Sequence, residues 1–371
     1  MHGALAVTRI LLVLDPSAPQ DWRAEAEAAL RADREVELVV PDAAGAARVR
    51  ERETAALSAA HACASEARAR YVRSELVEMA TDAARCEAEH AAALATPEGR
   101  PVLVDLLLAR GLAAHGHGDE PAARAAFARA VATDPDARLD ANLFPPGTTV
   151  AFAEARRTVE SSPRAEVVIR TDPAGAAVTV DGRRLGPSPV AVLLHPTDHL
   201  VRADLPGHRP LVAQLDLLGM GTVFALDALD GSEAQDDAAS WLASPEVGAV
   251  PALRAAAHAL GAGAVLVIVR DAANGRAVGT IYRMPSGSDS RSAGRGESVG
   301  DVARLLLHPP VALPPVRPPD PEDDLGILGT WWFWTAAGAF AVGTIALAVV
   351  PNLDEGPRRE YRYALVFGSP E

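Results

Sequence analysis

The pentapeptide Gly296-Glu297-Ser298-Val299-Gly300 matches the G-x-S-x-G pattern that surrounds the nucleophile of many hydrolases. That chemistry requires a strand before the serine, a helix after it and a histidine to act as general base. A helical sequence does follow, but a Gly/Ser/Arg-rich segment precedes the motif, and the only histidine downstream is His308. We therefore interpret the motif as a chance match and predict no catalytic residues and no enzymatic activity.

Two pairs of histidines have spacings that could suggest a metal site. His195 and His199 are four residues apart, but a proline and a turn between them prevent the geometry of a helical pair. His115 and His117 lie in a predicted interhelical turn, where polar side chains are expected to face solvent. The first apolar segment is followed by "DPSAPQD" (15–21), which is not a glycine-rich phosphate loop. We predict no metal and no cofactor.

The composition excludes further classes of function. All 35 basic residues of the 371 are arginine, so no Schiff base, lysine general base or P-loop lysine is available. The net charge of −14 argues against binding nucleic acid through a basic surface. We expect no nucleic-acid partner.

The two cysteines, Cys63 and Cys86, lie in one stretch that contains neither glycine nor proline. On a continuous helix they would be about 35 Å apart at 1.5 Å per residue. They can therefore pair only if a turn intervenes. Two cysteines provide neither a disulfide framework nor a zinc site, so the sequence leaves the redox compartment open.

A membrane span is predicted near the C-terminus. No residue from Leu325 to Leu353 is charged, and about 20 apolar residues are enough to cross a bilayer. We place the transmembrane helix at 325–350, with the lipid bilayer as its partner. The tryptophans expected at the membrane interface are Trp331, Trp332 and Trp334.

The segments that flank this span bear on its orientation. A proline-rich acidic linker, 308–324, precedes it, and the short tail 351–371 carries Arg358, Arg359 and Arg362. The positive-inside rule therefore favours a cytoplasmic tail and a periplasmic globular part. The N-terminal apolar run, interrupted by Arg9, resembles a signal peptide only weakly. The sequence therefore leaves open whether the globular part lies in the periplasm or in the cytoplasm.

The remaining segments predict α/β and helical units. Residues 1–42 give strand, helix, strand, and 232–307 give a second small α/β unit with a hairpin at Asn274-Gly275. Whether these two units share one sheet is open. Residues 43–162 are predominantly helix-forming.

Within the helical region, residues 101–135 resemble one tetratricopeptide (TPR) repeat. Small residues occupy the expected close helix contacts, an aromatic residue the core, and a proline the position after the second helix. Leu107 and Ala114 depart from the Trp and Tyr that this family prefers. A single repeat cannot bury its own apolar face, so packing scaffold and partner-docking roles both stay open. The matching positions are Gly111, Ala123, Phe127, Ala130 and Pro135.

Residues 165–229 contain successive short apolar strands, unlike the helical sequences around them. Asp181-Gly182 favours a tight turn, while Gly175 and Gly186 fit positions that need a positive φ or close backbone approach. The pattern predicts a small β-sandwich.

These residues resemble the PEGA domain, whose Pro-Glu-Gly-Ala signature has the form Pro173-Ala174-Gly175-Ala176 here. His199 lies where this family often has a histidine before a strand. Ala174, and His208 in place of a common tyrosine, are departures. The resemblance implies a β-sandwich module of bacterial envelope proteins without catalytic residues. The matching positions are Pro173, Gly175, Ala176, Val178, Val180, Asp181, Gly182, Gly186 and Pro189.

Together these features predict a multidomain α+β protein anchored by one C-terminal transmembrane helix. The order of its segments resembles bacterial membrane proteins of the myxobacterial type. We expect a non-enzymatic envelope protein that binds a protein, through its TPR-like helices, or a cell-wall or surface polymer, through its PEGA-like module. The alternative is a cytoplasmic tail-anchored adaptor that assembles signalling partners through the helices.

Overall fold

The computed structural model describes residues 7–140, 142–215, 223–245, 249–284, 291–295 and 298–308. All of them belong to a compact unit formed by residues 1–310. Within these ranges, no helix combines the length and the apolar character needed to cross a bilayer. The predicted span at 325–350, its three tryptophans and the tail lie outside the described residues.

A five-stranded sheet joins the two ends of this unit. Strand β1 pairs in parallel with β2 on one side and with β10 on the other, and β11 and β12 continue the sheet as antiparallel strands. The N-terminal unit and the unit at 232–307 therefore share one sheet, and we call the result the α/β domain. Its strands are β1 (Thr8–Leu14), β2 (Val36–Val39), β10 (Ala264–Arg270), β11 (Ala277–Arg283) and β12 (Arg291–Arg295).

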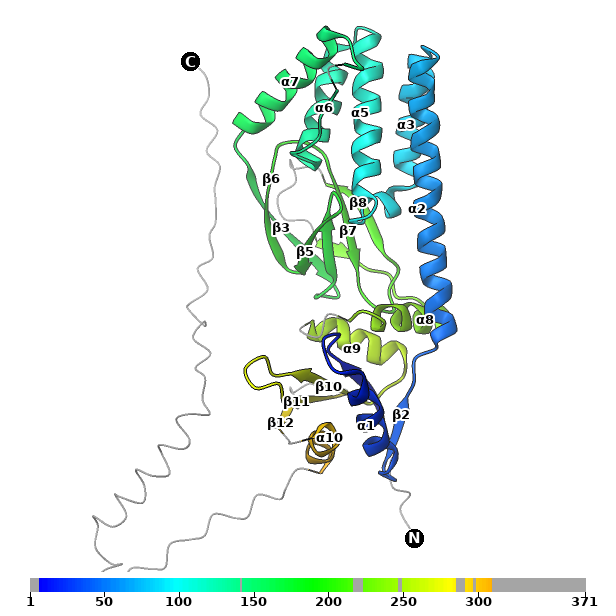
Figure 1. The fold of residues 1–371 in the computed structure, drawn as a ribbon, viewed down its shortest axis with the longest axis vertical. Coiled ribbons are helices and arrows are strands. Elements are labelled where there is room, and N and C mark those ends of the chain that lie inside the picture. Colours follow the sequence, from blue (N-terminus) through cyan, green and yellow to red (C-terminus); the bar gives the residue numbers. More distant parts are fainter. Residues whose placement is uncertain are drawn as a thin grey trace, which may run out of the picture. The chain divides into compact units, whose positions relative to one another are not determined.

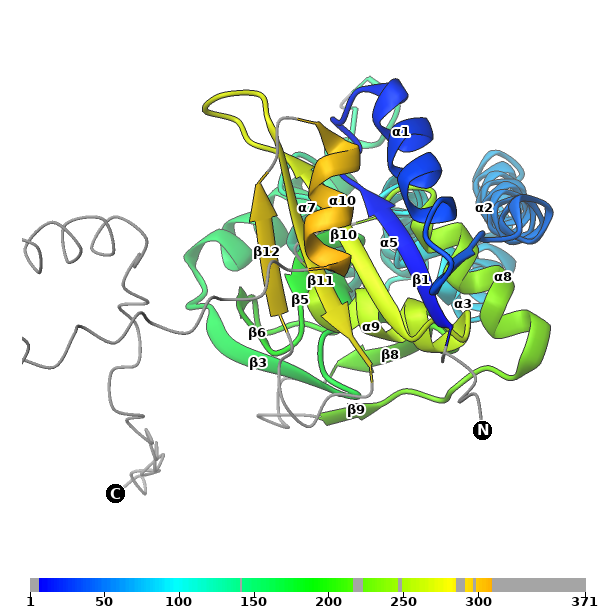
Figure 2. The same cartoon turned by 90° about the horizontal axis from the view of Figure 1, so that it is seen from below.

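Helices cover both faces of this sheet (Figure 2). Side chains alternate along β1: Ile10 and Leu12 pack on one face, whereas Leu11 and Val13 pack on the other. The first face is covered by α1 (Gln20–Arg31) and α10 (Val299–Leu307), and the second by α8 (Gly231–Leu242) and α9 (Val250–Ala259). The uninterrupted apolar run of β1 is what a parallel strand buried on both faces requires.

The chain between β2 and α8 forms a long insertion, and its first part is the helical region (Figure 1). Its helix-forming stretch 43–95 is not a single helix, because the chain reverses at Arg73–Glu75, where Ser74 has a φ of 60°. No glycine or proline marks this turn, so composition did not reveal it. The helices are α2 (Ala43–Val72), α3 (Leu76–Glu89), α4 (Ala91–Leu94), α5 (Arg100–Gly116), α6 (Glu120–Thr133) and α7 (Pro146–Ser161).

Helices α5 and α6 pack closely at Gly111. A Cβ atom there would lie 2.3 Å from Cε1 of the fully buried Phe127. Ala123 and Ala130 are also fully buried, and the carbonyl of Pro135 accepts a hydrogen bond from Arg156 of α7 at 2.7 Å. These contacts have the character that the TPR-like spacing predicts, and the assignment to that repeat family stays a prediction.

The second part of the insertion is a β-sandwich. Its two sheets have the strand orders β6-β3-β9 and β5-β4-β7-β8. The sequence did not reveal β5, which contains two arginines, a glycine and a proline, or the three-residue β9. The strands are β3 (Ala165–Asp172), β4 (Ala177–Val180), β5 (Arg183–Pro187), β6 (Val190–Leu194), β7 (His199–Asp204), β8 (Leu211–Leu215) and β9 (Val223–Ala225).

The sandwich is packed between the helical region and the α/β domain (Figure 1). Leu200 belongs to the same apolar core as α5 and α6. Ala203 and Leu205 instead pack with Ala252 of α9. One strand, β7, and the residue that follows it thus connect two cores.

The contact between Gly111 and Phe127 gives a stability prediction. Gly111→Leu should destabilise the protein by about 1–3 kcal/mol, because the added side chain has no space against the ring. Urea unfolding followed by circular dichroism measures this loss. Gly147→Ala, where the nearest atom would be His115 Nε2 at 3.8 Å, is the matched control and should leave the midpoint unchanged or raise it slightly. Equal midpoints for Gly111→Leu and the wild type would contradict the packing argument.

Candidate functional site

The signature turn of the sandwich is a tight two-residue hairpin loop. Val180 pairs with Arg183 across it, and Asp181 and Gly182 have φ values of 48° and 74°. Positive φ at both central residues is the type I′ geometry that matches the twist of the strands. A Cβ atom on Gly182 would lie 2.5 Å from the carbonyl oxygen of Thr96, so the turn touches the backbone that precedes α5.

Asp181 and His199 form a buried pair beneath this turn. Asp181 is 5% exposed and His199 is 2% exposed. Asp181 Oδ2 lies 2.5 Å from His199 Nδ1, and Oδ1 accepts a hydrogen bond from the Leu200 amide at 2.8 Å. The carboxylate therefore fixes both the turn and the start of β7.

Both ring nitrogens of His199 face acceptors. Nδ1 faces the carboxylate of Asp181, and Nε2 lies 2.9 Å from the carbonyl oxygen of His195. Only an imidazolium carries a proton on both nitrogens. Burial lowers the pKa of His199, but the hydrogen bond to Asp181 and its charge outweigh this effect, so the pKa is raised above its usual value.

The other signature loop is held by the hydroxyl of Ser188. The Gly175 amide donates to Ser188 Oγ at 2.9 Å and to its carbonyl oxygen at 3.0 Å, and Thr171 Oγ1 contacts the same hydroxyl. Pro173 and Pro189 follow cis peptide bonds, and Gly175 has a φ of 92°. A Cβ atom on Gly175 would lie 2.2 Å from Cβ of Pro251 in α9. This loop therefore rests against the α/β domain.

The signature residues thus hold internal contacts at two junctions of the fold. One signature loop meets the helical region, and the other meets α9. Both glycines with a close neighbour, Gly175 and Gly182, leave no space for a side chain. Gly186, with a φ of 116°, has no atom within 4 Å of an added Cβ, so its backbone conformation alone explains the glycine.

A third junction surrounds Arg202 of β7. Its guanidinium binds the Asp204 carboxylate at 2.7–2.9 Å, donates to the carbonyl of Ala92 at 2.8 Å and lies 3.6 Å from Glu53 of α2. Asp237 of α8 accepts a hydrogen bond from the Gly207 amide at 2.7 Å. Three elements therefore bring three carboxylates around one arginine.

This arrangement shifts the titration of Asp237. Burial raises its pKa to about 6, and the charges of Asp204 and Glu53 act in the same direction. The Gly207 amide and Arg202 oppose this shift without cancelling it. Ionisation of Asp237 near neutral pH therefore costs the folded protein free energy.

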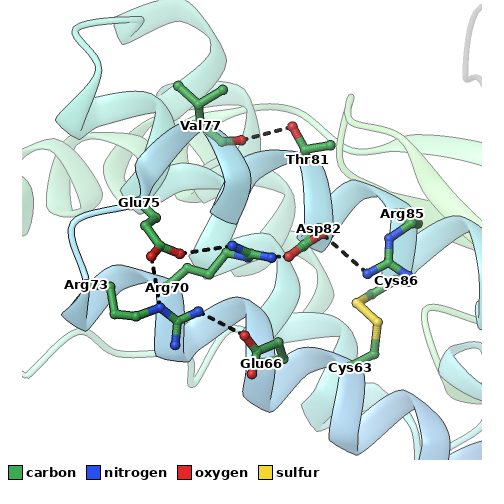
Figure 3. Close-up of polar contacts among 10 residues, drawn as sticks. All are labelled: Cys63, Glu66, Arg70, Arg73, Glu75, Val77, Thr81, Asp82, Arg85 and Cys86. Carbon is green, nitrogen blue, oxygen red and sulfur yellow. Dashed lines mark hydrogen bonds and ion pairs between the residues drawn. A yellow bond between two sulfur atoms is a disulfide. The ribbon is translucent and has the colours of Figure 1, made fainter.

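A disulfide and ion pairs fasten the α2–α3 hairpin (Figure 3). Cys63 and Cys86 form the disulfide, with their Cα atoms 5.9 Å apart. The turn at Arg73–Glu75 lies between the two cysteines and is the turn that their pairing requires. Nearer the turn, Arg70 pairs with Asp82 and with Glu75 at 2.9 Å. The hairpin is thus held both covalently and electrostatically.

The free end of the helical region exposes apolar side chains. Val72 is 85% exposed and Val77 is 54% exposed at the α2–α3 turn. Leu143 is 72% exposed, and the adjacent Phe144 packs on Tyr71 with ring centroids 5.6 Å apart. These loops therefore meet at one end of the helices. We call these three exposed side chains, together with Val150 of α7, which is 55% exposed, the apolar tip.

Ser298 of the hydrolase-like motif and His308 lie at opposite ends of one helix. Ser298 is the N-cap of α10, where its Oγ accepts a hydrogen bond from the Asp301 amide at 3.1 Å. His308 follows the other end of this helix and pairs with Asp33 at 2.5 Å. At 1.5 Å per residue the two residues lie about 15 Å apart. A strand, β12, does precede the motif where we expected a loop, but it is an edge strand.

The side chains of His115, His195 and His199 have partners of their own. His195 accepts a hydrogen bond from Arg164 at 3.1 Å, whereas the imidazole of His199 is occupied by Asp181. His115 lies 2.9 Å from Glu120. Within the described part of the chain, no group of three or more His, Cys, Asp and Glu side chains could hold a metal ion.

Comparison with known proteins identifies the sandwich. Residues 164–227 match the PEGA domain family, which confirms the predicted resemblance over this part of the chain. No curated protein matches the chain, and no solved structure matches it. The sandwich is thus a small β module inserted in a larger α+β protein. It is a PEGA domain.

The His199 pair predicts a pH-dependent stability. The pKa of His199 is higher in the folded protein than its unfolded value of 6.5. Protonated His199 therefore contributes its full share to the free energy of unfolding below pH 6.5, and this share is lost as the pH rises through the folded pKa. His199→Gln should cost about 3 kcal/mol at pH 6 and less at pH 9. Urea unfolding at both pH values measures this difference. His258→Gln, at an exposed site on α9, is the control. An equal loss at both pH values would refute the imidazolium.

At the Arg202 junction we predict that a substitution stabilises the protein, in contrast to His199→Gln. Since the folded pKa of Asp237 is raised from 3.8 to about 6, an ionisation cost of at most about 3 kcal/mol develops between these values and persists above them. Asp237→Asn should therefore stabilise the protein at pH 8 and about half as much at pH 5. Asp236→Asn removes only an ion pair with Arg48 and should lower stability slightly at both pH values. No gain for Asp237→Asn at pH 8 would contradict this ionisation cost.

Proposed function

We propose that this chain is a non-enzymatic, membrane-anchored protein of the bacterial cell envelope. It binds a protein partner through the free end of its helical region, and the PEGA domain holds that region against the α/β domain. The apolar segment 325–350 supplies the anchor.

The disulfide between Cys63 and Cys86 carries this proposal. Disulfides form and persist in oxidising compartments and are rare in the cytosol. Both sulfurs belong to the packed interface of α2 and α3, and Cys86 is fully buried. A structural disulfide inside a helical core supports an exported globular part over a cytoplasmic adaptor.

The apolar tip favours a protein as the partner. Its four side chains are each more than half exposed, whereas most large apolar side chains of the neighbouring helices α5 and α6 are buried. Ion pairs of Arg70 and Arg73 lie beside the turn between Val72 and Val77 and restrict its motion (Figure 3). A restricted apolar surface loses less conformational entropy on binding than a free one.

The PEGA domain is a weaker candidate for binding a polymer. Its signature loops at Gly175 and Gly182 are packed against α9 and against Thr96, which leaves no space beside them for a saccharide. Leu193 of β6 and Val223 of β9 are 58% and 59% exposed, but they lie on opposite edge strands of the three-stranded sheet. We therefore assign the domain a structural role.

Protease accessibility in intact spheroplasts, probed with an antibody against the PEGA domain, tests the proposed location. Cleavage without lysis, with a cytoplasmic marker protein left intact, is the expected result. Protection until lysis would refute export and favour the cytoplasmic adaptor. Thiol labelling gives an independent reading: acid-quenched, denatured full-length protein should accept a maleimide reagent at two positions only after reduction. Labelling without a reductant would remove the argument from the disulfide.

A further inference from the structure

The topology of the α/β domain creates a crevice at one edge of its sheet. The parallel strands lie in the order β2-β1-β10. The connection from β1 to β2 runs through α1 on one face, whereas the chain re-enters β10 from α9 on the other face. In open α/β sheets, ligands bind beyond the carboxyl ends of the strands where the connections diverge in this way.

A cavity of about 340 Å³ lies at this position. One wall is the loop between β1 and α1 together with the first turn of α1, and the other is the C-terminal end of α8. The Asp15 amide donates to the carbonyl oxygen of Ile268 in β10 at 3.0 Å, which ties the first wall to the neighbouring strand. The volume falls in the lower part of the range for small-molecule sites.

The polar groups of the lining carry opposite charges. Asp15 Oδ1 accepts hydrogen bonds from the amide and the hydroxyl of Ser17, which leaves Oδ2 without a hydrogen-bond donor among the described residues. Arg23 is 56% exposed and has one long ion pair, at 3.8 Å from Glu27. Gln20 adds an amide. The apolar lining residues are Leu14, Pro16, Ala18, Pro19, Leu242, Ala243 and Pro245.

We propose that this cavity binds a small zwitterion, an amino acid or a short peptide, with its carboxylate on Arg23 and its ammonium group on Asp15. A guanidinium pairs well with a carboxylate in two parallel hydrogen bonds. The proline- and leucine-lined walls accept an apolar side chain. This site lies in the α/β domain, and its role does not depend on protein binding by the apolar tip.

Calorimetric titration of the purified full-length chain in detergent with L-alanyl-L-alanine tests the proposal. Saturable binding is expected. Asp15→Asn, which keeps an acceptor for Ser17, and Arg23→Gln should each weaken it about 10- to 100-fold, as the loss of a charged hydrogen bond does. Arg34→Gln, an exposed site with the same change of charge, should bind like the wild type.

Blocked dipeptides separate the two contacts. The N-acetylated dipeptide should lose the contribution of Asp15, and the C-terminal amide should lose that of Arg23. Circular dichroism melting of each variant shows whether weaker binding reflects unfolding. Absence of saturable binding by the wild type, or equal affinities for the free and both blocked dipeptides, would overturn the proposal. Wild-type affinity in a folded Arg23→Gln protein would do the same.

Discussion

The parallel pairing of β1 with β10 is the constraint on which the rest of this fold depends. Ile10 lies opposite Ala264, so about 250 residues separate the partners along the chain. Closing so long a loop costs conformational entropy that only extensive packing can offset. The insertion must therefore begin and end at the same place. Close contact of α2 with α8 achieves this, because Gly45 allows Asp236 to approach and Arg48 pairs with that carboxylate at 2.9 Å.

The PEGA domain stabilises the insertion by packing against other elements at both ends. A free sandwich of this size buries a modest core, but here Leu200 joins the helical core while Leu205 joins that of α9. Polar contacts reinforce each junction: Thr179 donates to the carbonyl of Ala95 at 2.9 Å, and the Gly207 amide donates to Asp237. The signature residues therefore have a second role. Gly175 and Gly182 shape the turns of the domain and also let these turns pack against α9 and Thr96.

Local patterns predicted the local elements well and the long-range contacts poorly. The tight turn at Asp181-Gly182, the close contact at Gly111 and the apolar strand β1 all follow from short-range stereochemistry, and the structure has them. The hairpin at Asn274-Gly275 is also present, but its loop is longer, because the Asp271 amide donates to the carbonyl oxygen of Arg276, and of the two residues only Gly275 has a positive φ. The reversal at Ser74 carries no glycine or proline, and its cause is tertiary: Arg70, Asp82 and the disulfide hold α3 against α2.

The parts of the site that come from distant segments were beyond sequence reasoning. The cavity beside Asp15 exists only because β10 lies next to β1 and because α8 ends opposite α1. The segment "DPSAPQD", which we interpreted only as evidence against a phosphate loop, contains no sign of the second wall. Similarly, the pairing of Asp181 with His199 requires β4 and β7 to be neighbours in one sheet.

The absence of lysine determines where this protein can respond to pH. Arginine stays protonated throughout the physiological range, so the buried Arg129 and the partly buried Arg202 keep their charge. Any titration at the internal junctions must then occur on a histidine or a carboxylate. His199 at the helical side and Asp237 at the α/β side have raised pKa values, and both lose favourable protonation as the pH rises. The cost of ionising Asp237 develops between pH 3.8 and about 6, whereas the contribution of His199 is lost only above pH 6.5, so the two ends of the PEGA domain weaken in different pH ranges.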